Sequence, residues 1–196
     1  MHAQTLSGGF ETPPVDSAHA FRAVMEAMAR PGQIKDISGA QPPAPLSAAA
    51  GSVLLTLCDT DTPIYLAGDA DTDDVRAWLA FHTGAPLTGP SQAMFAVGRW
   101  EALVPLQGYQ IGTSEYPDRS ATLIVECTEL TTSGANLSGP GIKSRAALSL
   151  PELDAFQSNR GLFPLGLDFI FTCGGQVAAL PRSTIVSAPE GAMEVS

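Results

Sequence analysis

The chain has 196 residues, with ten basic and twenty acidic side chains and a formal net charge of −10. This acidic balance excludes the broad basic patches by which proteins bind nucleic acids and anionic membranes, so we expect neither as a partner. Apolar residues make up 44% of the chain and charged residues only 15%. These values indicate a globular domain whose surface is poor in charge or is partly covered by a partner.

The three cysteines, Cys58, Cys127 and Cys173, contain no pair at metal-ligand spacing. Reduced, buried thiols are the simplest interpretation, and they fit a cytoplasmic location. The N-terminal residues have neither the basic start nor the apolar run of a signal peptide. The most apolar stretch, 46–58, is shorter than the roughly 20 residues of a membrane helix. We therefore expect a cytoplasmic protein without a metal site.

The first predicted element is a helix that begins at Asp16 or Ser17, either of which can cap it, and ends at Pro31. Apolar side chains recur along it at helical spacing and predict its buried face; they are Phe21, Met25 and Met28. Residues 34–37 then favour a short strand, which a Pro-rich connection follows.

Two further helices and a strand are predicted before residue 90. Residues 46–58, mostly Ala and Leu, predict a buried helix, and residues 64–66 predict a strand. The acidic loop 69–74 leads into another helix that Thr72 can cap. That helix carries Val75, Trp78, Leu79 and His82.

The second half of the chain is richer in strands. Short apolar or β-branched runs at 93–97 and 122–127 predict buried strands. Residues 151–159 predict a helix with proline in its first turn. Residues 169–172 and 176–180 flank a Gly-Gly pair, which predicts a β-hairpin because a tight turn needs positive φ angles.

Strands mixed with helices along the whole chain predict an α/β fold: a three-layer αβα domain with a mixed sheet. No internal repeat or break in composition marks a second domain, so we expect one domain over residues 1–196. Its ends, about 1–8 and 188–196, are expected to be loose.

The motifs of several enzyme classes are absent. The chain has no Gly-x-Gly-x-x-Gly, no Gly-Lys-Ser/Thr ending of a phosphate-binding loop and no Gly-x-Ser-x-Gly nucleophile elbow. Its histidines, His2, His19 and His82, lie too far apart in the sequence to indicate a zinc site or a Cys–His pair. The residues alone therefore predict no self-evident active site.

Four loops carry more polar chemistry than a connection needs, namely 112–120, 138–143, 163–168 and 180–184. The first holds hydroxyls, two carboxylates and an arginine in nine residues. The glycines of the second allow backbone N–H groups to converge on an anion. For each of the four, an ordinary solvated turn is the alternative interpretation.

Together with three earlier segments, these loops resemble the PhnH family, subunits of the bacterial carbon–phosphorus lyase system. The similar segments keep one order over nearly the full chain; they are 9–10, 16–32, 54–63, 112–122, 137–142, 163–168 and 181–184. The resemblance implies a role in organic phosphonate catabolism. Such a subunit belongs to the core complex that forms the ribose 1-phosphonate 5-triphosphate intermediate before the C–P bond is cleaved. By itself it is expected to be accessory to the transferase and lyase activities of that system.

The resemblance also implies a fold like a reduced pyridoxal-phosphate-dependent transferase, without the cofactor site. A pyridoxal enzyme needs a buried lysine and an aspartate that pairs with the pyridine nitrogen. Lys35 follows a helix end and Lys143 lies in a Gly-Pro-Gly loop, so neither fits and we expect no cofactor. The implied partners are the other core subunits, and we expect the chain alone to be a homodimer.

A ligand-facing cluster is predicted from the polar loops. Two arginines and a serine would bind a phosphonate or phosphate group through forked, charge-assisted hydrogen bonds, and two glycines would add backbone donors. The full set is Asp118, Arg119, Ser120, Gly139, Gly141 and Arg182.

Arg22 and Arg30 lie eight residues apart on the first predicted helix and share a face, which we interpret as an interface. Two other hypotheses remain open. One is a free-standing enzyme or binding protein that acts on a small phosphorylated or phosphonate metabolite through the loops of Arg119 and Arg182. The other is a pure protein scaffold.

Overall fold

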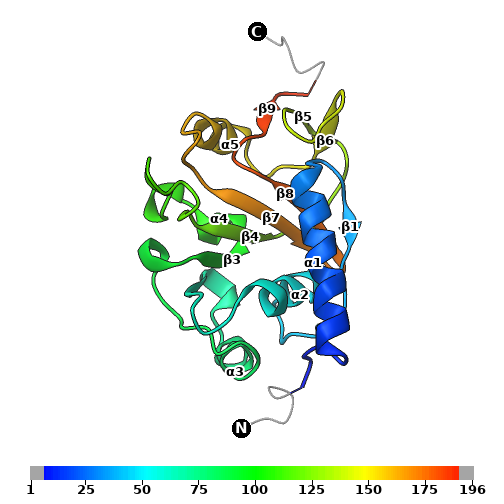
Figure 1. The fold of residues 1–196 in the computed structure, drawn as a ribbon, viewed down its shortest axis with the longest axis vertical. Helices are drawn as coiled ribbons and strands as arrows, with labels where there is room; N and C mark the ends of the chain where they lie inside the picture. The colour runs from blue at the N-terminus through cyan, green and yellow to red at the C-terminus, as the bar shows by residue number, and fades with distance from the viewer. Residues whose placement is uncertain (1–6, 190–196) are drawn as a thin grey trace.

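A mixed six-stranded β-sheet forms the centre of the computed structural model, which describes residues 7–189 (Figure 1). The strands are β1 (Lys35–Asp36), β2 (Ile64–Leu66), β3 (Phe95–Arg99), β4 (Thr122–Glu126), β7 (Asp168–Cys173) and β8 (Gln176–Leu180). They lie in the order β1-β8-β7-β4-β3-β2. Strands β7, β4, β3 and β2 run parallel to one another. Strand β8 is antiparallel to β7, and β1 is antiparallel to β8. The predicted α/β class, mixed sheet and β7–β8 hairpin are confirmed.

Three helices cover one face of the sheet: α1 (Pro13–Ala29), α2 (Ala48–Leu57) and α3 (Asp73–His82). The Ser47 side chain caps α2 by accepting a hydrogen bond from the Ala50 N–H at 3.1 Å. Thr72 caps α3 in the same way through the Val75 N–H at 3.2 Å, as predicted. The core on this face includes Val53, Leu54, Trp78, Leu79, Ile124 and Ile170.

The opposite face is covered by α4 (Trp100–Leu103), α5 (Leu153–Arg160) and a second, three-stranded antiparallel sheet. The strands of that sheet are β5 (Ala135–Ser138), β6 (Ala146–Leu148) and β9 (Ile185–Ser187), with β5 in the middle. Short 3₁₀ turns complete the described elements: η2 (Gly68–Ala70), η3 (Pro90–Gln92) and η4 (Leu106–Gly108). Figure 1 shows α5 and β9 together at one end of the molecule and α3 at the other. The sequence predicted neither the small sheet nor its pairing.

The buried face of α1 differs from the prediction. Phe21 and Met25 are 49% and 52% exposed, and the buried residues of the helix are Ala20, Val24 and Ala27. Small side chains face the core because α1 packs closely on α2 and β8. The helix also begins earlier, with Thr12 as its N-cap residue; the Asp16 carboxylate accepts a hydrogen bond from the Thr12 N–H at 2.7 Å.

Most of the two predicted loose ends lies outside the described residues. At the inner end of the first, the Ser7 carbonyl accepts a hydrogen bond from Trp78 Nε1 at 3.1 Å, and the Gly8 carbonyl accepts one from the Gln41 N–H at 2.8 Å. Within residues 7–189, no helix is both long and apolar enough to cross a membrane.

Candidate functional site

Arg182, which follows β8, joins three of the four polar loops. Its Nε donates a hydrogen bond to Asp168 Oδ1 at 3.2 Å, and its Nη1 donates one to the Pro117 carbonyl at 2.6 Å. Its Nη2 donates to Asp168 Oδ2 and to Ser120 Oγ. The Arg182 N–H donates to Asp168 as well, at 2.8 Å. Of the predicted ligand residues, the structure therefore brings Ser120 and Arg182 together.

The sheet explains this convergence. Asp168 begins β7 opposite Thr122, the first residue of β4, and Ser120 comes just before β4. Because β8 runs antiparallel to β7, Arg182 returns to the same edge of the sheet. The cluster lies at the amino ends of the parallel strands. In open α/β sheets, ligands usually bind at the carboxyl ends.

The two candidate glycines of loop 138–143 face different neighbours. A Cβ at Gly139 would lie 3.3 Å from the Ser183 carbonyl, so this glycine packs beside the Arg182 loop. A Cβ at Gly141 would lie 1.9 Å from the Ala29 carbonyl, at the end of α1. Gly139 thus adjoins the cluster, whereas Gly141 allows the close approach of the loop to α1.

Arg119 and Asp118 are exposed beside the cluster. The Arg119 guanidinium lies 4.1 Å from the centre of the Tyr116 ring, in a cation–π contact. No ion pair of Arg119 is found among the described residues. An exposed guanidinium of this kind can still meet an anion from solution.

Arg182 differs from Arg119 in what it can do. The side chains of Arg182 and Asp168 are only 14% and 17% exposed, and the bonds to Asp168, Ser120 and Pro117 use most of the five N–H groups of the guanidinium. A carboxylate in a partly desolvated site already neutralises this cation. The contacts of Arg182 therefore hold the loops in place.

Thr184, in the same loop as Arg182, carries a buried hydroxyl. The residue is 2% exposed, and within residues 7–189 its Oγ1 has no hydrogen-bond partner. The hydroxyl-rich composition of the loop was visible in the sequence, but the burial of this side chain was not.

A second polar site, at the carboxyl ends of β3 and β4, was missed at the sequence level. A cavity of about 240 Å³ is lined there by Arg99, Glu101, Glu126 and Cys127, among others. Glu126 accepts hydrogen bonds from the Ser47 N–H at 2.7 Å and from Thr172 Oγ1 at 3.0 Å. A glutamate at the end of an apolar strand run was the available signal.

Electrostatics make this second site a poor match for a phosphorylated ligand. Burial raises the pKa of Glu126, and the hydrogen bonds from Ser47 and Thr172 oppose that shift. Burial also raises the pKa of Cys127 to about 12, so its thiol is protonated at neutral pH and is a weak nucleophile. Three carboxyl groups and one guanidinium line the cavity, so this lining does not favour the binding of an anion.

The remaining candidates lie apart from both sites. Arg22 is exposed on α1, next to Phe21, and Arg30 is exposed at the C-cap of that helix. Lys35 Nζ pairs with a Glu26 oxygen at 3.0 Å, and Lys143 is exposed in its loop. In the described part of the chain, no group of three or more His, Cys, Asp or Glu residues could hold a metal ion.

Comparison with known proteins gives one consistent result. Residues 8–187 match the family model described as "Bacterial phosphonate metabolism protein (PhnH)". A relative in Rhizobium meliloti (strain 1021), "Alpha-D-ribose 1-methylphosphonate 5-triphosphate synthase subunit PhnH", is 42% identical over 192 residues, which cover 93% of this chain and 96% of the relative. The "Putative C-P lyase subunit protein HtxG" of Stutzerimonas stutzeri is 28% identical over 179 residues, 86% of this chain and 84% of that protein.

Proposed function

Because this chain belongs to the PhnH family, we propose that it is a subunit of the carbon–phosphorus lyase core complex in organic phosphonate catabolism. It supports formation of the ribose 1-phosphonate 5-triphosphate intermediate that precedes C–P bond cleavage. The observation that carries this proposal is the 42% identity to the Rhizobium meliloti subunit, over nearly the full length of both chains. The chain acts as an accessory subunit, and the chemistry is completed by its partners.

Co-purification tests this function directly. The affinity-tagged chain, co-expressed with the remaining core subunits, is expected to retain them through size-exclusion chromatography in a fixed ratio. An unrelated tagged α/β protein of similar acidity is the control, because nonspecific retention would affect both. If the chain elutes without any of the subunits, the proposed function is wrong.

The phosphonate or phosphate contact of this subunit is assigned to Arg119, with the loops around it as support. Arg119 is exposed and has no carboxylate partner among the described residues, whereas Arg182 donates hydrogen bonds to both Ser120 and Asp168. Asp118 flanks Arg119 on the exposed turn. Gly139 keeps loop 138–143 against the Arg182 loop. In this arrangement Arg182 and Ser120 are positioning residues.

The fold itself is proposed to be a reduced form of the pyridoxal-phosphate-dependent transferase fold that has no cofactor site. The placement of the lysines supports this view. Lys35 lies on an edge strand and pairs with Glu26, and Lys143 is exposed in a loop, so neither is held in a buried site that faces an aspartate.

Self-association is proposed to use the exposed side of α1. Phe21 and Met25 lie one helical turn apart, and each is about half exposed. Of the predicted interface residues, Arg22 is exposed on the same helix and Arg30 is exposed at its C-cap. Apolar side chains on a surface helix, bordered by charge, are typical of an interface between helices, and a two-fold axis would bring α1 of two copies together.

The double change Phe21→Glu and Met25→Glu is expected to convert the dimer to a monomer. Two carboxylates cannot be desolvated in a contact between identical helix faces, while both positions tolerate charge in the free chain because they are exposed. Light scattering should give a mass near 20.3 kDa for this variant and about twice that value for the unaltered chain. The control is Phe81→Glu, since Phe81 is exposed on α3. A dimer that survives the double change would place the contact elsewhere.

A further inference from the structure

A groove between residues 104–111 and α5 lies on the face of the sheet opposite α1; we call it the α5 groove. Its volume is about 890 Å³, and its apolar lining includes Leu106, Tyr109, Ile111, Ala155, Leu162 and Leu167. Tyr109 and Leu167 are buried at its base, whereas Leu162 is 45% exposed at its lip. Cavities of about 300–1,000 Å³ are typical of sites that accept a ligand or several side chains.

Two polar side chains of the groove already have hydrogen-bond partners within the chain. Asn159 Nδ2 donates a hydrogen bond to the Leu167 carbonyl at 2.9 Å, and Asn159 Oδ1 accepts one from the Leu167 N–H at 2.8 Å. Trp100 Nε1 donates one to Glu152 Oε2 at 3.1 Å, which ties α4 to the start of α5. Burial raises the pKa of Tyr109 to about 12, so its hydroxyl stays neutral. The groove is therefore built to receive apolar groups.

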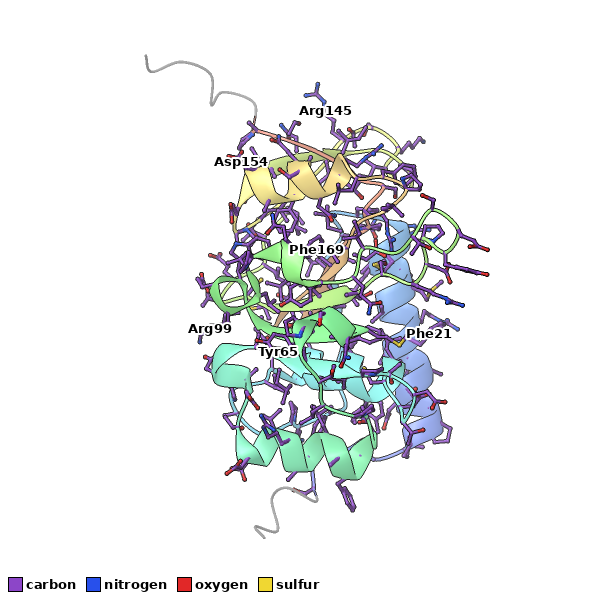
Figure 2. All side chains as sticks on the ribbon, turned by 90° about the vertical axis from the view of Figure 1, so that its left-hand side faces the viewer. Phe21, Tyr65, Arg99, Arg145, Asp154 and Phe169 are labelled. Atoms are coloured by element: carbon purple, nitrogen blue, oxygen red, sulfur yellow. The ribbon has the colours of Figure 1, made fainter. Side chains whose placement is uncertain are left out.

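The charge at the rim has one sign. Among residues 7–189, the charged side chains that line the groove are those of Glu152 and Asp154, both acidic and both exposed. Figure 2 shows Asp154, on α5, and Phe21, on α1, at opposite sides of the view. An occupant that is apolar on one side and basic at its border would match both the lining and the rim.

We propose that the α5 groove docks a basic amphipathic helix of a partner subunit, an inference that rests on the proposed function as a complex subunit. The exposed side chain of Phe163, next to Leu162, continues the apolar surface beyond the groove, which favours an occupant longer than a small molecule. Apolar side chains at helical spacing would fill the groove, and Lys or Arg residues on the flank would face Asp154.

A second copy of this chain fits the groove less well. The exposed apolar face of the chain belongs to α1, which packs on one side of the sheet. The groove residues belong to the core on the other side. A contact between α1 of one copy and the groove of the next would be head to tail, and it would not close into a symmetric dimer.

Two exposed positions test the proposal in the full chain, co-expressed with the other core subunits. Asp154→Lys reverses the charge of the rim, and Leu162→Asp places a carboxylate in the apolar contact. Each variant is expected to weaken association with the partner subunits by about tenfold or more, while its melting temperature stays that of the unaltered chain. Phe81→Asp, on the exposed side of α3, is the matched control and should associate normally. Hydrogen exchange in α5 and in residues 104–111 should slow when the complex forms.

The outcomes separate the docking proposal from the proposed function. If the unaltered chain binds the subunits and both groove variants bind equally well, the groove is not the docking site, although the subunit function stands. If the unaltered chain binds no subunit, both proposals are wrong. If the groove variants lose only self-association, a second copy occupies the groove.

Decylamine tests whether the groove binds a small cationic amphiphile. That occupant would be indicated if decylamine raises the melting temperature of the unaltered chain, Leu162→Asp abolishes the rise, and subunit binding is unchanged. Either of these last two results would overturn the helix as the occupant.

Discussion

Replacing Arg182 with glutamine is expected to lower the free energy of unfolding by about 3 kcal/mol, because the change leaves the Asp168 carboxylate partly buried without its cation. Both side chains are less than one-fifth exposed, so water cannot fully replace the lost partner. The shorter amide also cannot reach Asp168, Ser120 and the Pro117 carbonyl together. Urea unfolding, followed by tryptophan fluorescence, measures the loss.

Arg119→Gln is the matched control for this prediction. Arg119 lies in the same loop as Pro117 and Ser120, but its described contact is an exposed cation–π pair with Tyr116, which contributes about 1 kcal/mol or less. If Arg182→Gln costs no more than Arg119→Gln, Arg182 does not hold the loops together. Methylphosphonate supplies a second readout. A melting-temperature rise that Arg119→Gln abolishes and Arg182→Gln only weakens would agree with the roles proposed for them.

Local chemistry explains which parts of the fold the sequence predicts. The Thr72 cap and the glycine turn between β7 and β8 depend on neighbouring residues alone, and both are confirmed. The parallel strands were visible as short apolar runs because both of their faces are buried. The small sheet was not visible, since it pairs Ser138 with Ile185 across a long stretch of chain.

The face of α1 shows a different limit of sequence patterns. Helical spacing of large apolar residues predicted Phe21 and Met25 in the core, yet alanine and valine fill the close contact with α2 and β8. A pattern detects an apolar stripe, but it cannot tell a core from an interface. The large exposed side chains are the reason why self-association through α1 is proposed above, and that interface stays a prediction.

The sequence predicted which loops form the candidate site, but it did not predict which side chains bond each other there. Three polar loops do meet at Arg182, because β4 and β7 begin and β8 ends at one edge of the sheet. The carboxylate that neutralises Arg182 is that of Asp168, and the register of β7 places this side chain beside the guanidinium. A sequence shows that an arginine and an aspartate are present, whereas only the fold shows that they satisfy each other.

Gly141→Ala is expected to destabilise the protein by about 3 kcal/mol, since two costs combine at this position. The residue has a φ angle of 81°, which side chains other than glycine rarely adopt. The new Cβ would also lie 1.9 Å from the Ala29 carbonyl, so loop 138–143 or the end of α1 must move. The free energy of unfolding in urea gives the total.

Gly174→Ala separates the two costs. Gly174 also has a positive φ, 56°, but a Cβ there would meet nothing within 4 Å. This control should therefore show the backbone cost alone, about 1 to 2 kcal/mol. A larger loss at Gly141 would mean that the loop is fixed against the end of α1, the helix proposed for self-association, and the variant should then also weaken the proposed dimer. Equal losses at the two glycines would show that the loop moves away without cost, which would leave its backbone N–H groups available to an anion.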